Sequence, residues 1–370
     1  MRRLLCLLLA LLTLPLCACA AAPTAAEDVP TGELALAYAE NFHVDFYEGG
    51  AALLTVNGQT RHLLLPAGAR IPRGLEGLPA IRTPVKRVYL ASSSAADLFV
   101  QAGALDALHC TATTADGWRL PELRTAMEEG RLLYAGKYSA PDYELLLTEG
   151  CDLVVENTMI LHSPATREKL EQLGLPVVIE YSSHEPHPLG RVEWVKLYGL
   201  LTGRLEETER FYERQLELFE SLEGAERTGK KAVFFHITAN GAAAVRKRAD
   251  YVTRMIELAG GETALTELPE SENALSTVSI QMESFYQQAR DADVLIYNGT
   301  VSGGVEHMEQ LLALCPLLAD FKAVRDGNVW CTEQSMFQKS SAAAEMIAEL
   351  HAIFTDSAAA GELQFLYKVT

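Results

Sequence analysis

Residues 205–222 read LEETERFYERQLELFESL, and this stretch determines how the rest of the chain is organised. It lacks Gly and Pro and is rich in Glu, Arg and Gln, which predicts a helical rod of about 27 Å. Apolar or neutral side chains recur every three or four positions and form one stripe, while charged residues cover the other faces. An ordinary surface helix would show the same pattern, so the flanking sequence decides between a surface helix and a connector. The stripe consists of Leu205, Thr208, Phe211, Tyr212, Leu216 and Phe219.

The segment 188–223, which contains this rod, separates two halves that have the same order of elements. Each half alternates short apolar runs, polar loops (238–250 and 298–305 among them) and helical stretches, which predicts parallel sheets with helices on their faces. We therefore predict an α/β fold with two Rossmann-like lobes, each built on a central parallel sheet, joined by one long α-helix. The predicted strands are 88–91, 105–110, 152–155, 176–179, 232–237, 293–297 and, as the last strand, 329–331. The predicted helices are 95–102, 141–149, 165–173, 251–259, 282–290, 308–314 and 341–354.

A β-meander is predicted before the first α/β units. Residues 33–66 alternate in strand fashion, and Asn57-Gly58 between two extended runs predicts a hairpin. His43 and His62 fall in these strands, and we interpret both as surface residues and not as ligands. The predicted domains are an N-terminal lobe, connecting helices and a C-terminal lobe. Their boundaries are 33–187, 188–223 and 224–370.

The N-terminus has the features of an export signal. Two arginines precede an apolar run from Leu4 to Leu16 that is too short to span a bilayer. The run ends Leu16-Cys17-Ala18-Cys19, which resembles the bacterial lipoprotein box. The resemblance implies a signal peptide at 1–18, cleavage before Cys19 and lipid on that residue; a plain secretory signal is the alternative. Residues 19–32 would then form a flexible, lipid-anchored tether, because Ala, Pro, Thr and acidic residues bury little surface.

Composition and charge exclude several classes of protein. Of the 370 residues, 49% are hydrophobic and 22% are charged, which suits two folded domains. The formal charge of −18 becomes −20 when Arg2 and Arg3 are removed, because no acidic residue precedes Cys19. Nucleic acid and anionic lipid surfaces are therefore poor partners. Four cysteines remain outside the signal region, and their wide spacings favour buried free thiols over a zinc site or a disulfide framework.

Several short stretches occur in an order and spacing that are specific when taken together. They are Val85–Val88 with the serine loop after it, Gly136–Tyr138, Asp142–Val155, Leu173–Val177, Tyr198–Glu209, Met255–Gly261 and Leu311–Val329. In this order they resemble the helical-backbone, or class III, solute-binding proteins of ABC importers, the group that handles iron complexes and vitamin B12. The resemblance covers nearly all of the chain after Thr31. Cys151 stands where the family usually has Pro, a small departure.

The resemblance implies binding without covalent chemistry. We expect an extracytoplasmic lipoprotein, anchored to the cell membrane through Cys19, that binds an iron complex (siderophore or haem) between its lobes. It would deliver this solute to an ABC permease and its ATPase, as a monomer that is not an enzyme and has no covalent cofactor and no resident metal. In this family an acidic residue on each lobe docks onto the permease, and by motif position these residues are Glu144 and Glu283. Chemistry alone would make both of them solvated helix residues.

The loops after the predicted strands supply the candidate residues of the interlobe cleft, because ligands of parallel sheets bind at the carboxyl ends of the strands. Aromatic and Met side chains offer polarisable walls for a large ring system, and Arg supplies positive charge for carboxylates of a siderophore, haem or corrin. From the first lobe the candidates are Trp118, Lys137, Tyr138, Met159, His162 and His184. From the second lobe they are Arg246, Arg248, Tyr251, Asn298, Met336 and Phe337. Each of them could also be an ordinary loop residue.

Four alternatives stay open. The solute could be cobalamin or another corrinoid, or a bare transition metal held by His162, His184, His187 and His236. Haem iron could be held by His162 or Tyr138 as a single axial ligand. An extracytoplasmic metallocofactor enzyme would need a nucleophile with a base or a cofactor loop, and the sequence has neither. The fourth alternative is a receptor or adhesin that uses the fold as a spacer.

Overall fold

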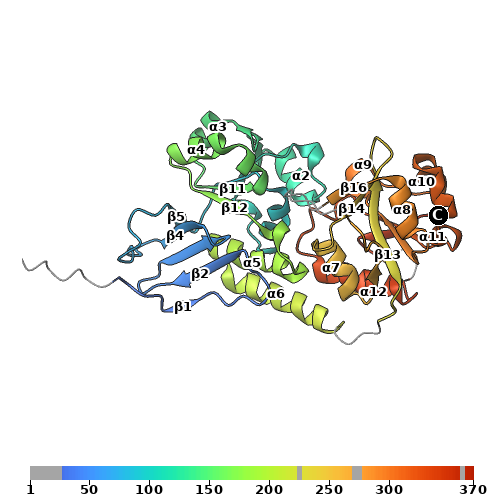
Figure 1. The fold of residues 1–370 in the computed structure, drawn as a ribbon. Coiled ribbons are helices and arrows are strands. Elements are labelled where there is room, and N and C mark those ends of the chain that lie inside the picture. The colour runs from blue at the N-terminus through green and yellow to red at the C-terminus, as the bar shows by residue number, and fades with distance from the viewer. Residues whose placement is uncertain (1–26, 223–226, 269–276, 359–362) are drawn as a thin grey trace, which may run out of the picture.

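The computed structural model describes residues 27–222, 227–268, 277–358 and 363–370, and Figure 1 shows how they are arranged. The predicted signal peptide, Cys19 and most of the tether lie outside the described residues. In this view the N-terminal sheet lies at the lower left below the N-terminal α/β lobe, the C-terminal α/β lobe lies at the right, and helix α6 runs along the lower edge. Among the described residues, no helix combines the length and the apolar character needed to cross a bilayer.

The N-terminal sheet confirms the predicted meander and extends it to five strands in the order β1-β2-β3-β4-β5. Asn57 and Gly58 both have positive φ (50° and 64°) in the tight turn between β3 and β4, as the hairpin prediction requires. β5 pairs with β4 in parallel, whereas the other neighbours are antiparallel. One prediction is wrong here: His62 is only 2% exposed, because its side chain lies beneath the sheet and not on the surface. The strands are β1 (Gly32–Glu33), β2 (Phe42–Phe46), β3 (Ala52–Val56), β4 (Thr60–Pro66) and β5 (Ala80–Thr83).

The N-terminal lobe contains a wholly parallel sheet in the order β12-β11-β6-β7-β8. Alternate strand residues enter two different cores, because successive side chains point to opposite faces. Its strands are β6 (Val88–Leu90), β7 (Leu108–Thr111), β8 (Leu133–Tyr134), β11 (Leu153–Asn157) and β12 (Val177–Glu180). Its helices are α1 (Ala96–Gln101), α2 (Pro121–Glu128), α3 (Tyr143–Thr148) and α4 (Pro164–Gln172), and a small ribbon pairs β9 (Gly136–Lys137) with β10 (Ala140–Pro141).

The C-terminal lobe is mixed and not purely parallel. Its central strands β13, β17 and β18 are parallel, but β14, β16 and β19 pair antiparallel to their neighbours. The predicted loop 238–250 therefore contains a strand, and 329–331 is not the last strand of the chain. The strands are β13 (Lys231–Ile237), β14 (Ala243–Arg246), β15 (Glu262–Thr263), β16 (Thr277–Ile280), β17 (Val294–Tyr297), β18 (Val329–Thr332) and β19 (Leu366–Lys368).

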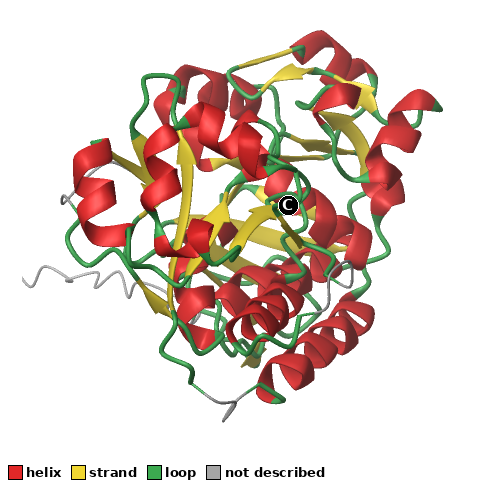
Figure 2. Cartoon of the chain, turned by 90° about the vertical axis from the view of Figure 1, so that its right-hand side faces the viewer, coloured by secondary structure: helices red, strands yellow, loops and turns green. Residues whose placement is uncertain are grey.

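Helices cover both faces of this second sheet (Figure 2). Residues from α7 and α12 share one hydrophobic core with alternate residues of β13, β17 and β18, and residues from α8, α10 and α11 share the opposite core. The helices are α7 (Tyr251–Leu258), α8 (Met282–Ala289), α9 (Gly299–Ser302), α10 (Met308–Leu314), α11 (Lys322–Arg325) and α12 (Ala343–Phe354). All four cysteines outside the signal region are buried free thiols, as predicted.

The described part of the segment 188–223, predicted to hold connecting helices and the interlobe rod, contains two helices. α5 (Pro188–Thr202) is buried almost all round, whereas α6 (Leu205–Glu220) buries Thr208, Tyr212, Gln215 and Phe219 on one face. The chain turns between them at Gly203, whose φ of 75° ends α5 in the left-handed conformation that Gly adopts readily. α6 reaches the C-terminal lobe, where Gln215 Nε2 donates to Glu345 Oε1 of α12 at 2.8 Å. The rod prediction is thus confirmed for α6.

A second connection links the lobes on the side of the cleft. We call residues 335–341 of the C-terminal lobe the interlobe strap. Gln338 Oε1 accepts from the Arg119 amide at 2.7 Å, and its Nε2 donates to the Gly117 carbonyl at 2.9 Å. The Ser341 amide donates to the buried Asp97 carboxylate of α1 at 2.9 Å. These contacts hold the lobes together at a second point, in addition to the helical connection.

Buried carboxylates fasten the N-terminal sheet to α5. Glu193 has no exposed surface and accepts hydrogen bonds from the backbone amides of residues 37–39 at 2.8–3.0 Å. Lys196 Nζ balances this charge at 2.7 Å and lies 4.4 Å from the Tyr212 ring centroid on α6. Glu185 accepts from the amides of residues 40 and 41 in the same way. The N-terminal sheet, α5 and α6 are thus held together by paired or hydrogen-bonded charges, as burial of charge demands.

Candidate functional site

A cleft of about 610 Å³ lies between the two lobes. Its N-terminal side is formed where β6, β11 and β12 end, and Arg191 of α5 packs against Tyr251 and Phe337 of the opposite side. Its C-terminal side is formed by the segment that follows β14, the start of α7 and the interlobe strap. On the N-terminal side this is the carboxyl edge of a parallel sheet, where such sheets bind ligands. The lining residues are Ser93, Ser94, Thr158, Met159, Ser183, His184, Glu185, Arg191, Arg246, Lys247, Ala249, Asp250, Tyr251 and Phe337.

Two arginines in the cleft wall are held against aromatic rings. The Arg191 guanidinium carbon lies 4.6 Å from the Tyr251 ring centroid, and Arg191 Nη2 donates to the Phe337 carbonyl at 3.4 Å. The Arg246 guanidinium carbon lies 4.5 Å from the Phe337 centroid and 5.4 Å from that of Phe234. Stacking of this kind fixes the plane of a guanidinium, whose edge is the part that donates to carboxylates and other oxygen anions.

Asp250 lies behind Arg246 and partly balances its charge. Its Oδ2 is 3.5 Å from Arg246 Nη1, and its Oδ1 accepts from the Val252 amide at 2.9 Å, which caps α7. Burial raises the pKa of Asp250, and the Arg246 charge opposes that rise. One carboxyl group thus faces two guanidinium groups in this wall, and the excess of charge is positive.

His184 offers a neutral imidazole on the opposite side of the cleft. Partial burial lowers the pKa of His184, so its ring is uncharged at neutral pH. Its Nδ1 lies 3.2 Å from Ser183 Oγ, and its ring makes an edge contact with Tyr181 at 5.6 Å. A neutral imidazole is a suitable ligand for iron or another transition metal within a bound complex.

The serine loop after β6 is fixed by a buried glutamate. Glu180, at the end of β12, accepts from Ser92 Oγ at 3.0 Å, from Ser94 Oγ at 2.6 Å and from the Ser182 amide at 2.8 Å. These bonds join the loop after β6 to the loop after β12, and Ser94 lines the cleft. The polar side of the cleft is therefore held in place before a solute binds.

Five of the twelve predicted ligand-binding residues line the cleft, and seven do not. The five are Met159, His184, Arg246, Tyr251 and Phe337. The seven residues elsewhere are Trp118, Lys137, Tyr138, His162, Arg248, Asn298 and Met336. Whether the five contact a solute stays a prediction.

The seven residues outside the cleft lie in three kinds of position. Trp118 and Met336 are packed in the hydrophobic core, and Trp118 has no exposed surface. Asn298 is buried and caps α9, accepting from the Thr300 amide at 3.1 Å. Arg248 is exposed and lines a different depression beside α7. Of the remaining three, Lys137 lies on β9, Tyr138 directly follows β9, and His162 lies just before α4.

The four histidines of the bare-metal alternative are not brought together. His187 stacks on Tyr38 at 4.1 Å, and its Nδ1 accepts from the Leu189 amide at 3.2 Å. Burial lowers the pKa of His187 to about 4, with the Arg254 charge adding to the effect. Of these four, only His184 lines the cleft. In the described part of the chain, a different group, Glu33, His43 and Asp45, brings three ligating side chains within reach of one ion.

Arg191 is the cleft residue that sequence reasoning missed most clearly. It belongs to α5, which we expected to be a connector and not a wall of the site. A signal was present, because Arg191, Glu193 and Lys196 are charged residues in an otherwise apolar segment. Charges inside such a segment need partners. Their partners come from the N-terminal sheet, α6 and the strap, which the sequence does not place.

The two predicted docking residues lie on different lobes. Glu144 is in the first turn of α3 and Glu283 is in the first turn of α8, and both are exposed. A helix N-terminus favours a carboxylate at such a position, so their placement has a structural explanation as well. Their role in docking stays a prediction.

Comparison with known proteins places the chain in a family. The model of the family described as "Periplasmic binding protein" matches residues 88–335. An uncharacterized lipoprotein of Methanocaldococcus jannaschii, MJ0872, is 24% identical over 315 residues, which cover 81% of this chain and 77% of the relative.

Two solved structures share the fold. A periplasmic binding protein from Veillonella parvula has a TM-score of 0.60 at 15% identity and covers 81% of this chain and 97% of its own. The periplasmic heme binding protein HutB of Vibrio cholerae has a TM-score of 0.56 at 18% identity and covers 70% of this chain and 96% of its own. The chain belongs to the class III periplasmic binding protein family, whose members are solute-binding partners of ABC permeases and not enzymes.

Proposed function

We propose that this protein binds an anionic iron complex, a siderophore or haem, in its interlobe cleft and delivers it to an ABC permease. The observation that carries the proposal is the pair of arginines, Arg191 and Arg246, held by aromatic rings in one wall of the cleft. Tyr251 and Phe337 present ring surfaces, and Met159 is polarisable; such groups suit a large conjugated ligand. A fold neighbour is a named haem-binding protein, which supports the same solute class.

The charge of the protein makes this local arrangement informative. A chain with a formal charge of −18 repels anions over most of its surface, so a positive cleft wall favours an anionic solute locally. Carboxylates of haem or a siderophore would meet the guanidinium edges, and neutral His184 could approach the metal from the opposite side. A corrinoid, whose side chains are largely amides, would make less use of the two arginines.

Delivery requires an anchor and a docking surface, which we assign to Cys19 and to Glu144 with Glu283. The relatives are named lipoproteins, which supports an extracytoplasmic, lipid-anchored protein. Exposed carboxylates on separate lobes give two widely spaced anchors for basic residues of a permease, and arginine partners could bind them bidentately.

The binding proposal is tested by titrating the purified protein with haemin, ferric siderophores of several ligand types and cyanocobalamin, followed by absorbance. Arg191→Gln should weaken binding of the preferred iron complex by roughly tenfold to a hundredfold, the cost of losing a charge-assisted hydrogen bond. Arg191→Lys keeps the charge but loses the planar guanidinium. Its affinity for the complex should lie between that of the wild type and that of Arg191→Gln.

Arg248→Gln is the matched control, because Arg248 is exposed and lies outside the cleft. It should bind as tightly as the wild type. Tight binding of cyanocobalamin that is unaffected by Arg191→Gln would instead indicate a corrinoid carrier.

A further inference from the structure

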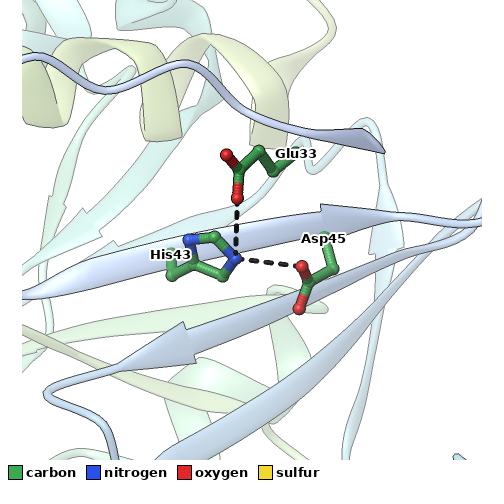
Figure 3. A group of neighbouring side chains, drawn as sticks. All are labelled: Glu33, His43 and Asp45. Atoms are coloured by element: carbon green, nitrogen blue, oxygen red, sulfur yellow. Dashed lines mark hydrogen bonds and ion pairs between the residues drawn. The ribbon is translucent and has the colours of Figure 1, made fainter. Parts of the chain in front are cut away.

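The N-terminal sheet carries three side chains that could bind a metal ion, and none of them lines the cleft. Glu33 lies on β1, and His43 and Asp45 lie on the neighbouring strand β2. Figure 3 shows both carboxylates directed at the same imidazole nitrogen. His43 Nε2 is 2.9 Å from Asp45 Oδ1 and 3.7 Å from Glu33 Oε2. The three ligand atoms all lie within 4.8 Å of one another.

These separations fit a small metal ion. Zn²⁺ bonds to imidazole nitrogen and carboxylate oxygen at about 2.0–2.2 Å, and in tetrahedral geometry neighbouring ligand atoms are then roughly 3.4 Å apart. The observed 2.9 and 3.7 Å lie on either side of this value. Small side-chain rotations would equalise them. The partly exposed cluster leaves the fourth position to water.

The strand register gives an independent reason for a cation here. Glu33 and Asp45 are direct partners across the antiparallel β1–β2 pair. Like charges directly opposite each other destabilise such a pair. A divalent ion would neutralise both carboxylates. β1 has only two residues and lies at the sheet edge, so the ion would fasten the first strand after the tether to the sheet.

We propose that Glu33, His43 and Asp45 form a binding site for a divalent first-row transition metal ion, the sheet-edge ion site. One imidazole and two carboxylates suit zinc, iron or manganese, whereas calcium and magnesium prefer oxygen ligands alone. The site is separate from the solute cleft and does not depend on the function proposed for it.

The test uses the mature chain, purified without a histidine tag and stripped of metal. It is titrated with Zn²⁺ by calorimetry and with Co²⁺ by visible absorbance. We expect one ion per chain at this site, lost in His43→Ala and weakened at least tenfold in Glu33→Gln and in Asp45→Asn. His109→Ala is the matched control: His109 contacts a single carboxylate, Glu149, at 2.8 Å, and the variant should bind like the wild type.

A second measurement separates loss of the site from loss of the fold. Metal-free His43→Ala should have the far-ultraviolet circular dichroism of the metal-free wild type, and Zn²⁺ should raise the Tm of the wild type but not of the variant. The proposal is overturned if wild type binds neither ion, if His43→Ala keeps the same stoichiometry, or if Ca²⁺ binds as tightly as Zn²⁺. Haemin binding should persist in His43→Ala, and Zn²⁺ binding in Arg191→Gln, so either proposal can fail alone.

Discussion

His62 shows how one buried side chain makes stability depend on pH. Its side chain is only 2% exposed. Burial lowers the pKa of His62 to about 4, with the Arg167 charge adding to the effect. Between pH 6.5 and 4 the unfolded chain therefore binds a proton at His62 that the folded chain does not. The free energy of unfolding falls as the pH falls through this window.

Replacing His62 with Leu should flatten this dependence. The wild type should lose roughly 2–3 kcal/mol from this group between pH 6.5 and 4, because each pKa unit corresponds to about 1.4 kcal/mol. His62→Leu should lose correspondingly less, as measured by urea unfolding at several pH values. His162→Leu, at an exposed position, is the control. If the free energy of unfolding changed with pH equally in His62→Leu and wild type, His62 would not be the source of the pH dependence.

At the scale of elements, the crossing of α5 and α6 depends on a glycine. A Cβ at Gly199 would lie 2.1 Å from Thr208 Oγ1 and 2.9 Å from the Arg204 carbonyl oxygen. Both distances are too short for a methyl group, so Gly199→Ala should force the helices apart. We expect a loss of about 1–3 kcal/mol in the free energy of unfolding, the usual cost of overpacking.

Gly32→Ala is the matched control for this prediction, since a Cβ there meets nothing within 4 Å. Thermal or urea unfolding of both variants provides the measurement. If Gly199→Ala were as stable as Gly32→Ala, close helix approach would not be what Gly199 provides.

At the scale of the whole molecule, two connections limit how far the lobes can move. α5 and α6 join them on one side, and the strap joins them through Gln338 and Ser341 on the other. We therefore expect only a small rotation when a solute binds. The radius of gyration from small-angle scattering should agree within error between free and loaded protein. Gln338→Ala with Ser341→Ala should widen the range of motion, and a large contraction of the wild type would refute the prediction.

Docking on the permease is also a property of the whole molecule. Glu144→Arg combined with Glu283→Arg should abolish uptake in cells and leave solute affinity unchanged, because both carboxylates are exposed and outside the cleft. Glu206→Arg with Glu213→Arg makes the same change of charge on the exposed face of α6 and should leave uptake intact. Wild-type uptake by the first double variant would eliminate the docking role.

The sequence was sufficient for the two α/β lobes, the hairpin at Asn57-Gly58 and the helix of α6. These depend on local periodicity and turn residues, which a single chain displays directly. It was insufficient for β14, whose four residues, Ala-Ala-Val-Arg, lie beside basic loop residues and are stabilised by pairing with β13 and β16.

The cleft also combines features that the sequence predicted with features that only the tertiary structure placed. The sequence by itself determined that the loops after the parallel strands of the N-terminal lobe, which carry Met159 and His184, would reach one edge, since parallel strands end together. Only the tertiary structure decided that Trp118 is buried in the core, that Arg191 from a connecting helix completes the wall, and that the strap closes one side. The physical reason is that the environment of a loop or helix side chain is set by elements distant in the chain, and such contacts leave no periodic pattern in the sequence.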